Sequence, residues 1–355
     1  MKNLKTILIS LLLSINFITF AQIPNGYYDS AIGKRGVQMQ AALHNIIKGH
    51  TSVSYSSLHT HYQVTDKKPN GKVWDMYSDV PGGTPPYEFT FITDKCGSYQ
   101  NEGDCYNREH SFPQSWFNKA SPMKSDLFHV YPTDGKVNGY RSSYPYGEVS
   151  NPSKTTLNGS KLGPNTTPGY SGTVFEPIDA YKGDFARTYF YMATRYYTED
   201  AGWKNNAAVN GSQMKPWELN TLYQWHLQDT VSQKEIDRNN AVYGIQNNRN
   251  PFIDHPEWVD SIWFDDTSVE WIKNNILLSV YPNPAVNSID VRISSTRINK
   301  WELTIYDMQG KMVYNSITEG NSSRINISEL KSGIYFLQIK SSNDKVFKNI
   351  KWVKQ

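Results

Sequence analysis

The spacing of apolar and polar residues changes twice along this 355-residue chain. The first 21 residues combine two lysines, a predominantly apolar run from Ile7 to Phe20, and small residues just before Gln22. This pattern predicts a cleaved signal peptide over residues 1–21, because the apolar run is too short to cross a bilayer. We therefore expect an exported, soluble mature protein without a membrane span.

Helical spacing follows in the middle of the chain. Apolar residues three or four positions apart predict helices over residues 33–49 and 183–197. In the second of these, Arg187 lies opposite a Met and aromatic stripe, so either solvent or a phosphate could face it. Two N-terminal signals predict further helices, namely a proline at 216 and a capping box formed by Ser232 and Glu235.

From Tyr281 onward the pattern becomes strict alternation with a period of two. Such alternation predicts half-buried strands, and their regular spacing favours a small antiparallel β-sandwich. The change of pattern places a domain boundary near 264–280, which gives a first domain over 22–265 and a second over 278–355. The clearest alternating runs are 289–293, 303–306, 325–327 and 335–339. The fold class that we expect is α+β.

Composition and charge exclude two simple explanations of function. With 38% hydrophobic and 19% charged residues, the chain is not intrinsically disordered. The formal net charge is +3, but the leader holds +2 and the segment from Ile276 onward holds +5, which leaves −4 for residues 22–275. A general attraction for polyanions is therefore not encoded, and nucleic acid would require a locally basic groove.

The two cysteines, Cys96 and Cys105, are close in sequence. In an exported protein such a pair favours a disulfide, with two free buried thiols as the alternative. Closing this short ring would contribute roughly 2.5 to 3 kcal/mol in the chain-entropy account.

Residues suited to catalysis are concentrated just after this pair. Two short runs and a helix capped by Thr133 indicate a strand, strand, helix unit between residues 106 and 149. Hydrolysis of a phosphodiester needs a base for water and a hard cation that stays partly open. His110 can supply the base, while the carboxylate of Glu109 and the amide oxygen of Asn138 suit Mg²⁺.

One geometric objection applies to this assignment. Adjacent residues on a regular strand point to opposite faces, so Glu109 and His110 can address one phosphate only where the pleat breaks. Pro113 downstream and Cys105 upstream make a strand end plausible there. On composition alone, a surface ion pair or a structurally satisfied histidine is the alternative.

Several segments together resemble the bacterial endonuclease I family, which comprises exported, metal-dependent, largely sequence-nonspecific nucleases with a ββα-metal (His-Me finger) core. The resemblance covers most of residues 25–263. The segments that carry it are NREHSFPQSWF at 107–117, SDLFHVYPTD at 125–134, VNGYR at 137–141, FEP at 175–177, KGDFAR at 182–187 and RNPFIDHPE at 249–257.

The resemblance implies a role for each matching residue. It places the general base on His110 and the metal ligands on Glu109 and Asn138. It assigns Arg141 to catalysis beside His110, and Arg108, His129 and Arg187 to nucleic-acid contact or to support of the site. Arg108, Arg141 and Arg187 are all candidates for the arginine that stabilises the cleaved phosphate. The chain has Ser142-Ser143 where the family often has an asparagine.

The C-terminal segment resembles the sorting domain of type IX secretion substrates, through YPNPA at 281–285, IYD at 305–307 and SGIY at 332–335. This resemblance implies a Gram-negative host, passage through the periplasm, and release to the surface or the medium. The alternative is an accessory carbohydrate-binding sandwich.

Together these features predict a secreted, monomeric endonuclease that hydrolyses DNA and also RNA with His-activated water and one Mg²⁺ ion, Ca²⁺ and Mn²⁺ being alternative ions. A second hypothesis is a catalytically inactive surface module that binds nucleic acid or glycan. A zinc protease is disfavoured because the chain contains no His-Glu-x-x-His run.

Overall fold

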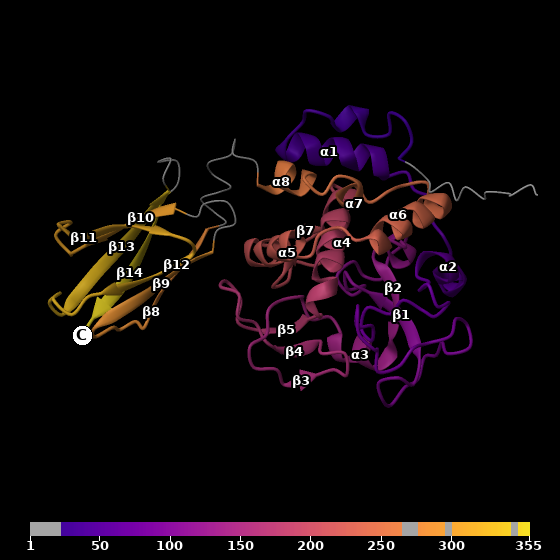
Figure 1. Cartoon of the computed structure of the whole chain (residues 1–355). Coiled ribbons are helices and arrows are strands. Elements are labelled where there is room, and N and C mark those ends of the chain that lie inside the picture. The colour runs from indigo at the N-terminus through magenta and orange to yellow at the C-terminus, as the bar shows by residue number, and fades with distance from the viewer. Residues whose placement is uncertain (1–22, 265–275, 295–299, 342–346) are drawn as a thin grey trace, which may run out of the picture.

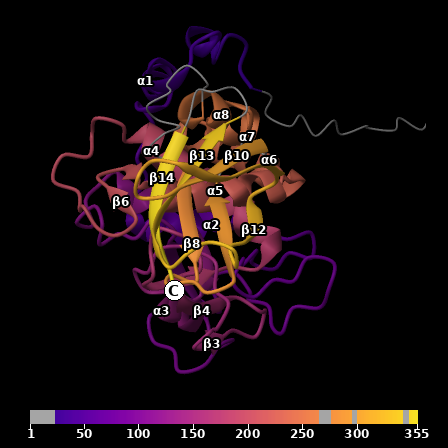
Figure 2. The ribbon, with the colours of Figure 1, turned by 90° about the vertical axis from the view of Figure 1, so that its left-hand side faces the viewer.

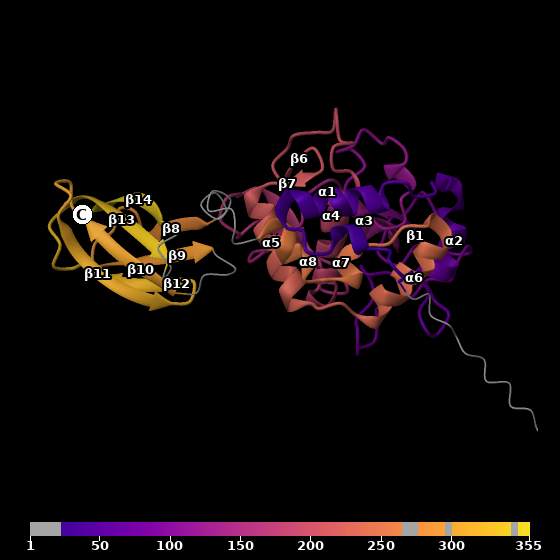
Figure 3. The ribbon, with the colours of Figure 1, turned by 90° about the horizontal axis from the view of Figure 1, so that it is seen from above.

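The computed structural model describes residues 23–264, 276–294, 300–341 and 347–355. These residues form two separate hydrophobic cores, one between Tyr28 and Phe264 and the other between Ile276 and Trp352. Figures 1 and 3 show them as two bodies, the larger one mostly helical. The predicted leader and most of the boundary at 264–280 lie outside the described residues. The domain limits stay a prediction.

The larger body is built around one buried helix, α4 (Lys182–Arg195), all of whose residues are buried. α1, α5 and α7 pack against it. The expectation that solvent or a phosphate faces Arg187 was wrong, because Arg187 is fully buried and forms an ion pair with Glu235. The other helices are α1 (Gly36–Ile47), α2 (Leu58–Thr65), α3 (Gly135–Arg141), α5 (Pro216–Gln228), α6 (Gln233–Gln246), α7 (Pro251–Asp254) and α8 (Trp258–Trp263).

The predicted helices are present, with local differences. α5 begins at Pro216, and α6 begins after Ser232, whose side chain forms the expected capping box with Glu235. The buried face of α1 carries Met39, Leu43 and Ile47 rather than Val37, which is 67% exposed. The described residues include no helix that is both long enough and apolar enough to cross a membrane.

A strand, strand, helix unit forms at the predicted place. β1 (Tyr106–His110) pairs antiparallel with β2 (Val130–Asp134), and α3 follows directly. The N-cap of α3 is Asp134 and not Thr133, because the Asp134 carboxylate accepts a hydrogen bond of 2.8 Å from the amide of Val137. Thr133 instead belongs to β2 and is fully buried.

Short strands complete the first domain, in the orders β3-β4-β5 and β6-β7. Four single turns of 3-10 helix connect the larger elements, at Asp29–Ala31, Tyr55–Ser57, Met123–Ser125 and Asp179–Tyr181. The strands are β3 (Lys154–Thr155), β4 (Lys161–Pro164), β5 (Thr173–Glu176), β6 (Val209–Asn210) and β7 (Gln213–Met214).

The smaller body consists of two antiparallel sheets, ordered β11-β10-β13-β14 and β12-β9-β8, and both contribute side chains to one core. Figure 2 views these strands from the side of the C-terminus. The four predicted runs coincide with β9, β10, β12 and β13. The strands are β8 (Leu277–Tyr281), β9 (Ser288–Ser294), β10 (Lys300–Tyr306), β11 (Met312–Glu319), β12 (Ser322–Asn326), β13 (Gly333–Ser341) and β14 (Phe347–Lys354).

Candidate active site

A cavity of about 460 Å³ opens beside β1 and α3. Four of the residues predicted from the sequence line it together, namely Arg108, Glu109, His110 and Asn138. Its other lining residues are Tyr55, Cys96, Gly97, Tyr99, Asn107, Pro113, Gln114, Gly139, Ser142 and Ser143. The serine pair, where the family often has an asparagine, thus lies at the same cavity.

The end of β1 resolves the geometric objection to the Glu109 and His110 pair. His110 is the last residue of β1, paired with Val130, and both Glu109 and His110 line the cavity. The predicted strand end is confirmed. Both side chains are almost completely buried, with exposed fractions of 2% and 4%.

The main chain orients the imidazole of His110. Its Nε2 lies 3.0 Å from the carbonyl oxygen of Lys124. A carbonyl only accepts, so Nε2 carries the hydrogen and Nδ1 carries the lone pair. Burial, with His129 nearby, lowers the pKa of His110 to about 3. The ring is therefore neutral at physiological pH, as a general base must be.

His129 lies behind His110 rather than at the cavity wall. Its ring centroid is 5.6 Å from that of His110, and it is fully buried. The Nε2 of His129 lies 2.6 Å from the carbonyl oxygen of Met123, one residue before the carbonyl that contacts His110. This arrangement supports the base and its surroundings, and it does not bring His129 to the cavity.

Glu109 is held by two donors on one oxygen. Tyr77 Oη donates to Oε1 over 2.9 Å and Arg141 Nη1 donates to the same atom over 3.0 Å. Burial raises the pKa of Glu109, and the Arg141 guanidinium opposes this by favouring the carboxylate. Tyr77 lies far from β1 in sequence, and no motif pointed to it.

Arg141 is enclosed behind the site. Its guanidinium is fully buried and also donates to the carbonyl oxygens of His110, over 2.7 Å, and Ser111. It therefore joins the Glu109 carboxylate to the end of β1. The arrangement favours a supporting role over the direct catalytic contact that the resemblance implied.

The amide of Asn138 is oriented by its neighbours across β1. Its Nδ2 donates to Asn107 Oδ1 over 2.7 Å, and the carbonyl oxygen of Arg108 lies 3.4 Å away. Because the nitrogen is used in this way, the oxygen Oδ1 is the atom left to act as a ligand. The orientation is the one that a metal-binding amide requires.

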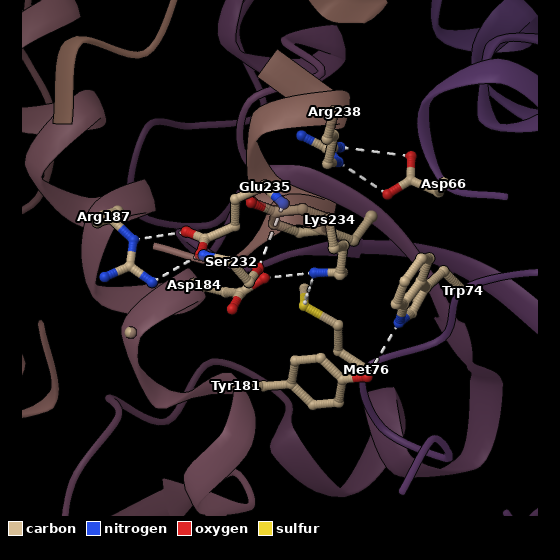
Figure 4. Close-up of polar contacts among 12 residues, drawn as sticks. Asp66, Trp74, Met76, Tyr181, Asp184, Arg187, Ser232, Lys234, Glu235 and Arg238 are labelled. Atoms are coloured by element: carbon tan, nitrogen blue, oxygen red, sulfur yellow. Dashed lines mark hydrogen bonds and ion pairs between the residues drawn. The ribbon is translucent and has the colours of Figure 1, made fainter. Parts of the chain in front are cut away.

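The remaining two arginine candidates differ sharply. Arg108 lines the cavity, and its Nη1 donates to the Tyr55 carbonyl oxygen over 2.9 Å. Arg187 is fully buried and grips Glu235 through Nε and Nη2, as Figure 4 shows. The structure does not bring Arg187 to the cavity, so its burial does not favour a contact with nucleic acid.

The predicted disulfide is present and borders the cavity. Cys96 and Cys105 are bonded, with their Cα atoms 5.7 Å apart. Tyr99, inside the closed loop, packs on α3, where a Cβ added to Gly135 would lie 2.5 Å from its ring. Only glycine permits this approach, so the loop and the helix that carries Asn138 are fitted to one another.

The donor set at the cavity fits a hard divalent cation. Within the described ranges, no group of three or more His, Cys, Asp or Glu side chains is placed to hold a metal. The set is instead one carboxylate, Glu109, and one amide, Asn138, as the sequence predicted. Two oxygen donors with room for water and phosphate suit Mg²⁺, and also Mn²⁺ or Ca²⁺.

Comparison with known proteins identifies both parts of the chain. Residues 35–257 match the endonuclease I family, and residues 279–354 match the secretion system C-terminal sorting domain. An extracellular ribonuclease of Bacillus amyloliquefaciens is 36% identical over 249 residues, which is 67% of this chain and 78% of that protein.

Two further relatives match this chain at lower sequence identity. An extracellular ribonuclease of Bacillus subtilis (strain 168) is 34% identical over 248 residues, covering 67% of this chain and 78% of its own length. Endonuclease-1 of Buchnera aphidicola subsp. Baizongia pistaciae is 28% identical over 131 residues, covering 37% of this chain and 46% of its own length.

Proposed function

Since this chain belongs to the endonuclease I family, we propose that it hydrolyses the phosphodiester bonds of DNA and RNA with a divalent cation, without sequence specificity. Nuclease activity follows from the family, and secretion to the cell exterior or surface follows from the sorting domain. The names of the two Bacillus relatives favour RNA as one substrate. We further propose that β1, β2 and α3 form a ββα-metal core and that the smaller body is a β-sandwich.

The observation that carries this proposal is that His110, Glu109 and Asn138 open onto one cavity. His110 accepts a proton from water at Nδ1, because the Lys124 carbonyl holds the hydrogen on Nε2. The neutral imidazole is ready for this step without first losing a proton. The resulting hydroxide attacks phosphorus in line, and the bond to the leaving 3′ oxygen breaks as that oxygen takes a proton from a second water molecule. His110 then releases its proton to solvent, which restores the neutral imidazole.

Glu109 and Asn138 would hold the cation, which when bound supplies positive charge to the phosphate oxygens. We assign Glu109 Oε2 to the cation, since Oε1 already accepts from Tyr77 and Arg141. Those two donors keep the carboxylate fixed, while the ionised form also gains from a nearby cation.

We assign stabilisation of the cleaved phosphate to Arg108. It lines the cavity, whereas Arg141 and Arg187 are enclosed by carboxylates and carbonyls. Contacts to phosphate and sugar carry no sequence information, which fits an enzyme without sequence specificity.

Digestion of matched single-stranded and double-stranded DNA and RNA tests the proposal. The purified protein is supplied in turn with Mg²⁺, Mn²⁺ or Ca²⁺, and then with EDTA. We expect cleavage of both nucleic acids with at least one of these ions and none with EDTA. Binding without cleavage under every ion would instead identify an inactive binding module.

A further inference from the structure

Tyr55 lines the cavity, and its ring contacts two positive side chains, those of Arg108 and Lys124. Arg108 Cζ lies 3.9 Å from the centroid of the Tyr55 ring, and Lys124 Nζ lies 4.7 Å from the same centroid. Both distances are within the range of a cation–π contact. The same ring lies nearly parallel to that of His110, with centroids 6.0 Å apart and 24° between the planes.

The backbone around Tyr55 is fixed, so the ring is a firm support. Tyr55 begins a 3-10 turn that leads into α2, and the Ser57 amide donates to Ser54 Oγ over 3.2 Å. The Tyr55 carbonyl oxygen accepts from Arg108. One residue thus positions the Arg108 guanidinium through both its ring and its main chain.

Arg108 and Lys124 bring two positive charges to one ring, and no carboxylate of a described residue neutralises either of them. Within the described parts of the chain, neither Arg108 nor Lys124 has an acidic partner within ion-pair distance. The buried arginines of the same domain all have one, in the pairs Arg141–Glu109, Arg187–Glu235, Arg195–Glu199, Arg238–Asp66 and Arg249–Asp254.

Two unneutralised cations beside a catalytic base suit an anionic polymer. We propose that Tyr55, Arg108 and Lys124 form a subsite for the backbone of the bound strand, in which Lys124 contacts the phosphodiester next to the scissile one. Tyr55 is the positioning residue that holds both cations. The subsite rests on the proposed function, since it presumes that a nucleic-acid strand enters this cavity.

Lys124 allows a clean test, because its two contributions belong to different parts of the residue. Its carbonyl oxygen orients His110, and its ammonium group lies over Tyr55. Lys124→Ala removes the ammonium group and keeps the carbonyl. We expect KM to rise roughly three- to tenfold with kcat nearly unchanged, and the slope of log KM against log salt to fall by about 1.

Two Tyr55 variants distinguish the cation–π contact made by the ring from the mere volume of the side chain. Tyr55→Phe keeps the aromatic face and should behave like the wild type. Tyr55→Leu should raise KM and reduce the further effect of Lys124→Ala, because the ammonium group loses its support. The control is Lys48→Ala, which removes an exposed lysine at the end of α1 whose ammonium group contacts Asn45 and should leave the salt slope unchanged.

The outcomes distinguish this inference from the proposed function. If the wild type cleaves with a divalent cation but Lys124→Ala leaves KM and the salt slope unchanged, the subsite is refuted and the nuclease assignment stands. A fall in kcat alone would also overturn the subsite, since it would indicate an effect through His110. If the wild type cleaves nothing, the proposed function itself fails.

Discussion

The two domains of this protein have cores of opposite character. The first encloses charged groups, including several fully buried arginines that are paired with carboxylates. The second is formed by aliphatic side chains together with Trp301 and Trp352, and ion pairs such as Lys300–Glu319 lie on its surface. A buried ion pair adds little stability in itself, but removing one partner leaves a costly charge. The catalytic domain therefore contains a polar framework that fixes side-chain positions, which a sorting domain does not need.

The largest effect should come from His110, the proposed base at the cavity of the first domain. His110→Ala removes the base, and we expect cleavage to fall roughly 100- to 10,000-fold. The fold should persist, because the side chain occupies the edge of a cavity rather than the middle of the core. Initial rates on supercoiled plasmid, with circular dichroism as the check on folding, measure this. Unchanged turnover would refute the assignment.

The next effect compares an ion pair from each domain. Arg187→Met leaves Glu235 buried without its partner and should cost about 3 to 5 kcal/mol of unfolding free energy. The matched variant in the second domain is Arg324→Met, whose contact with Asp290 at 3.7 Å is largely exposed and should cost at most about 1 kcal/mol. Denaturant unfolding measures both.

A double variant sharpens the same comparison. Adding Glu235→Gln to Arg187→Met removes the unpaired charge, so part of the lost stability should return. If the single variant costs no more than the surface variant, the buried Arg187–Glu235 pair does not fix the polar framework.

A smaller effect concerns an acid that the framework leaves unpaired. Glu218 is fully buried and makes no ion pair in the part of the chain that the structure describes. Burial raises its pKa well above 4.5, and the Arg141 charge and the Tyr146 amide oppose this only in part. The folded state keeps this proton while the unfolded state releases it, so wild-type stability falls as pH rises above 4.5.

Glu218→Gln should remove that loss. We expect the variant to be more stable than the wild type at pH 8 by about 1 to 3 kcal/mol, and the difference to shrink towards pH 4. Thermal unfolding of both proteins across this range is the measurement. A difference that is constant with pH would argue against a protonated Glu218.

The smallest effect on catalysis should come from removing the second domain entirely. Without residues 278–355 we expect kcat and KM within about twofold of the wild type, because the cavity is lined only by residues of the first domain. We expect export of the truncated protein to be lost. Immunoblots of the medium, the cell surface and the periplasm would measure where the protein accumulates. A large loss of activity would mean that the two cores depend on one another.

The second domain was the easier one to predict from sequence. Its strands alternate between the core and solvent, so β9, β10, β12 and β13 stand out as period-2 runs. β8, β11 and β14 were not among the predicted runs, and all three lie at sheet edges. β11 also has little burial, and a strand without a buried face has no strong alternation.

In the first domain, motifs and chemistry predicted residues that line the cavity, while the side chains that support them could not be predicted. Glu109, His110 and Asn138 come from one short stretch of chain. Their neighbours Tyr55 and Tyr77 come from distant segments, and nothing in the local pattern of either indicates a charged partner. The burial of Arg187 likewise depends on Glu235, 48 residues away.

The contact between His110 and the carbonyl oxygen of Lys124 has a consequence for the way this enzyme tolerates variation. Every amino acid offers that oxygen, so an exhaustive substitution library at position 124 would preserve the orientation of the imidazole in nearly all its members. A screen of side-chain substitutions would thus not report on this carbonyl group, which orients the base that we propose. Only a change that redirects the chain itself, such as an insertion between Met123 and Ser125, would expose it.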